Sequence, residues 1–102
     1  LMRLWELYQK RGLQFPAAVV DANHSNSDKK FKEQPRIVSE VLHSRRHSRD
    51  VNALVKGVMI ESYLEEGSQP IDGAQVPGRS ITDPCLGWPD TERLLLDMAE
   101  RV

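Results

Sequence analysis

Apolar residues recur along this chain with two different periods, one typical of helices and the other typical of buried strands. Near the amino terminus they recur every three or four positions, which predicts the buried face of a helix over residues 1–11: Leu1, Leu4, Trp5 and Tyr8. Gly12 and Pro16 then favour the end of that helix. Residues 17–22 and 53–60 are instead short apolar runs rich in valine, which predicts two strands buried on both faces.

The segment between the two predicted strands carries the next helical pattern. We predict a helix over residues 27–45 whose buried face is formed by Phe31, Ile37, Val38, Val41 and Leu42. Pro35 interrupts this pattern, because a proline inside a helix removes one backbone hydrogen bond and clashes with the preceding turn. Either one helix is kinked near Gln34, or a short first turn precedes a helix that starts at Pro35. We predict the single kinked helix, followed over residues 43–52 by a solvated helix end and a loop, because that stretch has no apolar periodicity.

Two strands joined through a helix predict a parallel β-α-β unit and therefore an α/β fold class. After this unit, residues 65–80 are rich in Gly, Pro, Ser and Gln, which predicts a long loop. A closing helix is predicted over residues 89–101, with a buried stripe of three residues: Leu94, Leu95 and Met98. We also expect both tryptophans, Trp5 and Trp88, to pack in the core.

Length and composition limit the class of protein. The 102 residues are 39% hydrophobic and 28% charged, which is typical of one small globular domain. The formal charge of −1 shows no basic excess, so we expect neither nucleic acid nor a membrane as a partner. The single cysteine, Cys85, cannot form an internal disulfide, and no apolar run approaches the ~18 residues of a membrane span. Without a signal-peptide pattern, we expect a cytoplasmic protein. The chain opens inside a predicted helix with no capping residue, which indicates a piece of a larger protein.

Three candidate metal ligands lie at or beyond the ends of the apolar runs: His24, Glu61 and Asp83. Carboxyl ends of parallel strands meet at one edge, and an imidazole with two carboxylates suits a divalent cation. Their wide spacing is weak evidence, since each has an ordinary structural alternative. His24 could bond to backbone at a strand end, Glu61 could be a surface carboxylate, and Asp83 could form a turn before Pro84. Cys85 could add a thiolate, although a lone cysteine beside leucine is more often a small buried group.

A basic cluster lies between the predicted helix and the second strand: His43, Arg45, Arg46, His47 and Arg49. No aromatic residue is interleaved for base stacking, which favours a solvated helix end over a nucleic-acid patch. The cluster also leaves open a second class of function, a non-enzymatic interaction module whose basic loop, 43–49, contacts an acidic partner.

Three strings in fixed order carry a specific resemblance: DANHSNSDKKFKEQ (21–34), GVMIESYLEEGSQ (57–69) and GRSITDPCLGWPDTERLL (78–95). Together they closely resemble the carboxyl-terminal part of the class I 3-deoxy-D-arabino-heptulosonate 7-phosphate (DAHP) synthases. The likeness covers nearly the whole chain and is weakest around residues 43–52. It implies a fragment of a (β/α)8 TIM barrel that holds the last two parallel strands and about three helices.

The resemblance also implies a metal site and a reaction. The family holds a divalent metal with a cysteine, a histidine, a glutamate and an aspartate, and the last three fall on His24, Glu61 and Asp83. The metal cysteine and the phosphate-binding residues would lie outside this chain, and Cys85 does not correspond to that cysteine. His24 and Asp83 would also contact the reactants. Manganese, iron, zinc and cobalt all remain open as the metal, and no other cofactor is implied.

The implied enzyme is a transferase that condenses phosphoenolpyruvate with erythrose 4-phosphate to DAHP and phosphate, the first step of the shikimate pathway. We expect the parent to be a homo-oligomer. The isolated chain is expected to be inactive, because two strands cannot close a barrel, and either to self-associate or to pack differently from the parent. A metal-dependent barrel fragment of different chemistry remains a further alternative.

Overall fold

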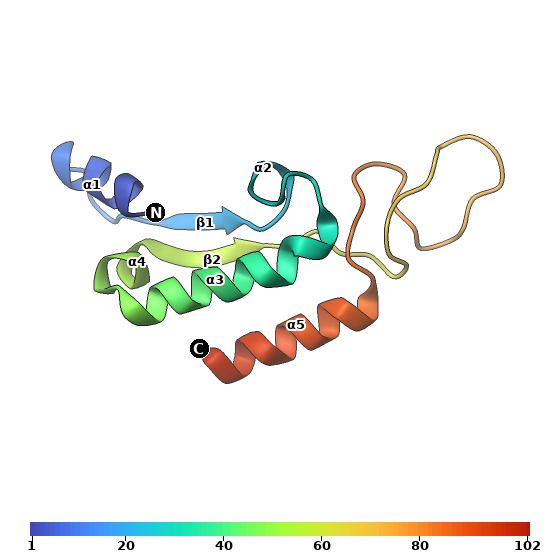
Figure 1. The fold of residues 1–102 in the computed structure, drawn as a ribbon. Helices are drawn as coiled ribbons and strands as arrows, with labels where there is room; N and C mark the ends of the chain where they lie inside the picture. The colour runs from blue at the N-terminus through green and yellow to red at the C-terminus, as the bar shows by residue number, and fades with distance from the viewer.

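The computed structural model describes residues 1–102 as an α/β arrangement with two parallel strands (Figure 1). The elements in chain order are α1 (Met2–Lys10), β1 (Ala18–Asp21), α2 (His24–Ser27), the 3-10 helix η1 (Phe31–Glu33), α3 (Gln34–His47), α4 (Arg49–Leu54), β2 (Val55–Met59) and α5 (Trp88–Arg101). β1 pairs with β2 from Ala18 opposite Val55 to Asp21 opposite Met59. The parallel pairing confirms the predicted β-α-β connection.

The core lies where α3 and α5 pack along one face of the strand pair (Figure 1). Its main cluster has six buried residues from the end of β1, from α3 and from the region of α5: Ala22, Ile37, Val38, Leu42, Leu86 and Leu94. A second cluster joins α3, α4 and β2 through Val41, Val51 and Val55. Four of the five residues predicted for the buried face of the central helix are therefore in the core, and the fifth, Phe31, is partly buried against it.

The prediction of one kinked helix over residues 27–45 is wrong. The short helix α2 ends at Ser27, and Asp28 and Lys29 then adopt left-handed backbone angles, with φ of 54° and 61°. A separate helix, α3, begins at Gln34 and places Pro35 in its first turn. Proline fits there because the first amide groups of a helix have no partner within the helix. The structure thus has the alternative of a short turn before a helix that starts near Pro35.

The prediction of a solvated helix end and a loop over residues 43–52 is confirmed for the helix end and wrong for the loop. α3 continues to His47, and the one-and-a-half-turn helix α4 follows after Ser48, whose hydroxyl accepts a 3.3 Å hydrogen bond from the Val51 N–H. Val51 and Leu54 are buried, but two apolar residues are too few to reveal a helical period. Because α4 occupies residues up to Leu54, β2 begins at Val55, two residues later than the predicted strand.

The strands are not buried on both faces as predicted. Val20 and Val58 face the core, whereas Val19 is 65% exposed and Met59 is 42% exposed. Side chains alternate between the two faces of a strand, and the helices α3 and α5 cover only one of them. In all, 16 of the 102 residues are buried, so much apolar surface lies open.

The helices at the two ends of the chain are also more exposed than predicted. α1 has no buried residue and lies at one end of the molecule, with Trp5 only partly covered (Figure 1). Trp88 is 49% exposed and Leu95 is 47% exposed, so the core position predicted for both tryptophans and for Leu95 is wrong. Leu94 is buried and Met98 packs partly against the core, as predicted.

The long segment between β2 and α5 contains the predicted loop, which projects at the end of the molecule opposite α1 (Figure 1). The side chain of Gln69 holds this loop together. Its amide donates to the carbonyl oxygens of Val76 and Arg79 at 2.8 and 2.9 Å, and its oxygen accepts from the Val76 N–H at 2.7 Å. Among the helices, none has the length and apolar character needed to cross a bilayer.

Candidate metal centre

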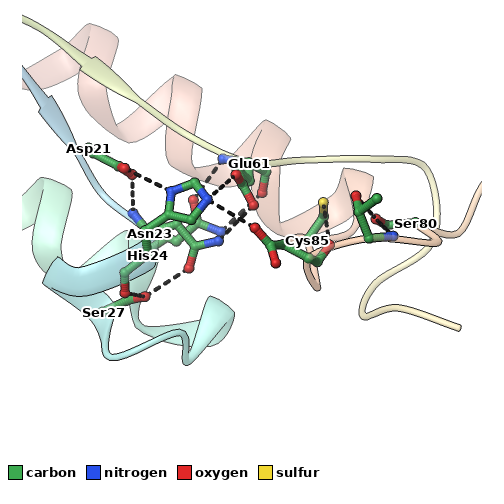
Figure 2. A network of polar contacts seen from close by, with 10 residues as sticks. Asp21, Asn23, His24, Ser27, Glu61, Ser80 and Cys85 are labelled. Atoms are coloured by element: carbon green, nitrogen blue, oxygen red, sulfur yellow. Dashed lines mark hydrogen bonds and ion pairs between the residues drawn. The ribbon is translucent and has the colours of Figure 1, made fainter.

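The end of β1 and the segment after β2 bring the candidate ligands to one edge of the strand pair. His24 begins α2 with a left-handed backbone, φ of 48°, which is uncommon for a residue with a side chain. Such angles cost on the order of 1–3 kcal/mol and occur often at functional sites. Glu61 follows β2 at the same edge, because the two strands are parallel. Figure 2 shows the His24 ring between Asp21 and Glu61.

All three predicted ligands meet at the Nε2 atom of His24. This atom lies 2.9 Å from Oε1 of Glu61 and 3.0 Å from Oδ2 of Asp83. One ligand atom from each residue lies within 4.8 Å of the other two. Asp83 reaches the cluster from the segment before α5, 59 positions after His24. The structure therefore brings together three residues that are distant in the sequence.

The donor set fits a divalent cation. A single ring nitrogen carries at most one proton, so it can donate to only one of the two carboxylates that face it. The second carboxylate then repels the first, and a cation among the three atoms would relieve that repulsion. The side chains of His24, Glu61 and Asp83 are 37%, 24% and 49% exposed, so the cluster is open to a reactant on one side.

Asp21 is a functional candidate that the sequence reasoning missed. Its Oδ2 lies 2.8 Å from Nδ1 of His24, and its Oδ1 accepts a 2.8 Å hydrogen bond from the Asn23 N–H. A carboxylate on Nδ1 keeps the proton there and leaves the Nε2 lone pair for a cation. The position of Asp21 as the last residue of the strand, three before His24, was the available signal.

Charges within the cluster shift two pKa values. Hydrogen bonds to Asp21 and Asp83 raise the pKa of His24 above its usual value and outweigh the opposing effect of burial, and the charges of Glu61 and Asp21 raise it further. Burial raises the pKa of Asp21, but the hydrogen bonds from Asn23 and His24 outweigh it, so the net pKa lies below its usual value. The metal-free cluster therefore favours a protonated imidazole at His24 beside an ionised Asp21.

Two buried amides, also missed from the sequence, contact Glu61. The Asn23 amide donates to Oε2 of Glu61 at 2.9 Å, and the Gln34 side chain bonds to both backbone groups of Glu61. Both amides reach Glu61 across more than twenty positions, which no local spacing reveals.

Comparison with known proteins identifies the family. The family model described as the DAHP synthetase I family matches residues 5–96, most of the chain. The chain belongs to the DAHP synthetase I family. It is 42% identical over 86 residues to the Trp-sensitive phospho-2-dehydro-3-deoxyheptonate aldolase of Escherichia coli, covering 82% of this chain and 24% of that protein. It is 41% identical over 96 residues to the Phe-sensitive aldolase of the same organism, covering 91% of this chain and 26% of that protein.

A solved structure of a DAHP family member has the same fold over this region. The phospho-2-dehydro-3-deoxyheptonate aldolase of Francisella tularensis superposes with a TM-score of 0.84 at 27% identity, over 99% of this chain and 29% of that one. The chain thus spans only about a quarter of the length of the curated relatives it matches.

In this DAHP synthetase family member Cys85 follows Asp83 by two positions but is not part of the three-residue cluster. Its thiol donates to the backbone oxygen of Asp83 at 3.4 Å. Burial raises the pKa of the Cys85 thiol, and the charges of Glu61 and Asp83 raise it further, against a hydrogen bond with Ser80. The three residues whose ligand atoms lie together do not include Cys85, so the thiolate ligand considered from the sequence has no support from this geometry.

The basic cluster of residues 43–49 lies at the opposite end of α3 from the metal centre (Figure 1). Arg45 and Arg46 line a cavity of about 460 Å³ together with Arg101 and Glu100 from α5. His43 and His47 lie one helical turn apart, with ring centroids separated by 4.3 Å and ring planes tilted by 46°. This cluster therefore contributes nothing to the chemistry at His24, Glu61 and Asp83.

Proposed function

We propose that this chain carries the metal half-site of a DAHP synthase, a metal-dependent transferase that condenses phosphoenolpyruvate with erythrose 4-phosphate. The observation that carries the proposal is the position of His24 Nε2, within 3.0 Å of carboxylate oxygens of both Glu61 and Asp83. Its support is that these residues occur in a chain of the DAHP synthetase I family, whose named relatives are phospho-2-dehydro-3-deoxyheptonate aldolases.

Each residue of the cluster has a separate task in this proposal. His24, Glu61 and Asp83 would hold a divalent metal, which when bound supplies Lewis-acid polarisation of a reactant carbonyl oxygen. Asp21 fixes the His24 ring through its 2.8 Å contact at Nδ1. His24 and Asp83 are the more exposed ligands and would also contact reactants, while the less exposed Glu61 supplies negative charge. Phosphoenolpyruvate and erythrose 4-phosphate would be the partners of the intact enzyme.

We further propose that the strand pair is part of a (β/α)8 barrel in the parent. Val19 and Met59 lie on the strand face that α3 and α5 leave uncovered. In a barrel, helices cover the outer face of each strand and the inner face packs against other strands. An uncovered apolar inner face beside a helix-covered outer face supports this arrangement. The chain alone would then be catalytically inert and would self-associate through its open strand face.

Calorimetric titration with Mn²⁺ tests the metal half-site directly. We expect saturable binding of one ion, and loss of that binding in His24→Ala, because the imidazole is a ligand. His47→Ala is the matched control, since it removes an exposed histidine at the end of α3. Equal binding by the unaltered chain and His24→Ala, or equal loss in both variants, would contradict the proposed site.

Binding measurements on the same chain test the alternative, a non-enzymatic interaction module that uses the basic loop 43–49. It predicts salt-sensitive binding to an acidic partner that is lost when Arg45, Arg46 and Arg49 are neutralised. Metal binding that depends on His24 and is unaffected by these arginine changes would favour the enzyme half-site. Release of phosphate from the two substrates by the isolated chain with added Mn²⁺ would refute the proposed inertness.

A further inference from the structure

Gln34 makes two hydrogen bonds to the main chain of Glu61. Its side-chain oxygen accepts from the Glu61 N–H at 2.8 Å, and its amide donates to the Glu61 carbonyl oxygen at 3.0 Å. Gln34 is 0% exposed, although glutamine is usually a surface residue. A buried amide is stable only where its polar atoms have partners, and here both partners belong to one residue.

The same carbonyl oxygen of Glu61 also accepts a 3.0 Å hydrogen bond from the Leu86 N–H. Glu61 lies beyond the end of β2, so the strand pairing itself does not fix its backbone. The Leu86 bond belongs to an isolated parallel bridge between Ser62 and Leu86, and Gln34, the first residue of α3, adds two further bonds to the same backbone. The backbone of the proposed ligand is therefore tied to the rigid start of a core helix.

Asn23 fixes the other end of Glu61, its carboxylate. The Asn23 amide donates to Oε2 at 2.9 Å, while its oxygen accepts from the Ser27 hydroxyl at 2.8 Å. A carboxylate only accepts hydrogen bonds, so the NH2 end of the amide faces Glu61, and the amide oxygen is left to accept from the Ser27 hydroxyl. Asn23 is 2% exposed, so water does not compete strongly for this bond. Figure 2 shows Asn23 between Ser27 and Glu61.

Because Asn23 is a neutral donor to one carboxylate oxygen of Glu61, the other oxygen keeps its negative charge for a cation. Oε2 of Glu61 is occupied by Asn23, and Oε1 lies 2.9 Å from Nε2 of His24. An arginine or lysine in place of Asn23 would neutralise the carboxylate, whereas an amide orients it and leaves its negative charge for a cation.

We propose that Gln34 and Asn23 are positioning residues that hold Glu61 from both ends so that one oxygen, Oε1, faces the cation. This inference rests on the proposed metal half-site. Partners of metal ligands generally change metal affinity by about 10- to 100-fold when they are removed. Neither residue touches a reactant in this assignment, and both act through Glu61.

The test measures Mn²⁺ affinity and metal-free stability of the 102-residue chain in parallel. Gln34→Met and Asn23→Leu keep approximate size and remove the hydrogen bonds, and Asn23→Ser keeps a short donor. We expect the Kd for Mn²⁺ to be about 10- to 100-fold higher in Gln34→Met and Asn23→Leu. In Asn23→Ser we expect a Kd between those of the unaltered chain and Asn23→Leu. Affinities are compared under conditions in which urea unfolding curves show each variant to be folded.

Thr91→Val is the matched control for a merely structural role. Thr91 is also buried and bonds to Ser62, the residue after Glu61, with the two hydroxyl oxygens 2.5 Å apart. We expect this variant to lose stability and to keep the Mn²⁺ affinity of the unaltered chain. Unchanged affinity in both Gln34→Met and Asn23→Leu would overturn the inference, as would an equal loss in Thr91→Val.

The outcomes separate this inference from the metal site on which it rests. Absence of Mn²⁺ binding by the unaltered chain would reject the proposed site itself. Binding that depends on His24 but not on Gln34 or Asn23 would keep the site and reject the positioning role. If Gln34→Met does not fold, the Asn23→Leu and Asn23→Ser pair still tests the network, and equal affinity of these two variants would reject the role of Asn23.

Discussion

Oδ2 of Asp21 lies 2.8 Å from Nδ1 of His24, on the side of the ring opposite the two carboxylates at Nε2. This contact determines which ring nitrogen faces the proposed cation. Asp21 also contributes to the raised pKa of His24, because its carboxylate accepts a hydrogen bond from the ring and favours the protonated form. Orientation and proton affinity at the metal centre are thus both dependent on one residue of β1.

Asp21→Asn is expected to change the pH dependence of metal binding. A cation must displace the proton from Nε2, so affinity rises as the pH rises through the pKa of His24 in the folded protein. Because Asp21 raises that pKa, its neutralisation should move the rise to lower pH. It should also weaken binding at alkaline pH about 10- to 100-fold, because the ring loses its anionic partner. Mn²⁺ titrations at a series of values from about pH 5 to 8 measure both effects.

Asp28→Asn is the control for this change. Asp28 is exposed and ends α2 in a left-handed conformation, which asparagine also adopts readily. We expect the pH profile of this variant to coincide with that of the unaltered chain. A profile of Asp21→Asn that also coincides would show that Asp21 does not govern the protonation of His24.

Stability of the metal-free chain should depend on pH with a sign set by the same cluster. The pKa of His24 is raised by folding, so its contribution is complete below the unfolded value of about 6.5 and is lost as the pH rises through the folded value. The pKa of Asp21 is lowered, so its contribution is present above about 3.9 and is lost as the pH falls through the folded value. Urea unfolding in a chelator should therefore give a higher midpoint near pH ~5.5 than near pH ~8.

The variant His24→Ala tests whether His24, rather than another titrating group, causes this pH dependence of stability. The variant should be less stable than the unaltered chain at the lower pH, and the difference should diminish at the higher pH. His47→Ala should keep the pH dependence of the unaltered chain. If the difference in unfolding midpoint between the unaltered chain and His24→Ala is the same at both pH values, the pH dependence does not come from His24.

The cluster of His24, Glu61 and Asp83 could be predicted from the sequence because it follows from strand ends and motifs. His24 and Glu61 each follow an apolar run that pairs in parallel, so their shared edge was inferable, and the SITD string placed Asp83 with them. The residues around the ligands were not inferable. Asn23 contacts Glu61 across 38 positions and Gln34 contacts it across 27, and no local spacing predicts either contact.

The wrong predictions in the fold have a common physical origin. Apolar periodicity identified the core face of α3 but not its start, because the same residues fit a longer helix kinked at Pro35. Periodicity also failed over residues 43–52, where α4 is too short to display a period. Valine-rich runs predicted burial on both faces, yet no helix or strand of residues 1–102 covers Val19 and Met59.

Pro35→Ala tests the corrected start of α3. Proline in a first turn stabilises mainly by restricting the unfolded chain, so its replacement should lower the free energy of unfolding by roughly 0.4–1 kcal/mol. An interior proline would give the opposite sign, because its removal would restore a hydrogen bond and relieve a clash worth about 3 kcal/mol. Ile37→Ala, in the core two residues later, should cost about 2–5 kcal/mol and calibrates the urea measurement.

The open strand face predicts self-association of the isolated chain. Val19 is paired with Gly57 and Met59 with Asp21, so both apolar side chains lie on the face that α3 and α5 do not cover. Their burial between two copies would remove apolar surface from water at roughly 25 cal/mol per Å². Val19→Lys combined with Met59→Lys should therefore shift the chain towards monomer in light scattering after size-exclusion chromatography. Ile71→Lys, which changes an exposed apolar residue of the long loop, should leave the association unchanged. The prediction fails if the unaltered chain is already monomeric at high concentration. It also fails if Ile71→Lys dissociates the chain as well as the two changes on the strand face do.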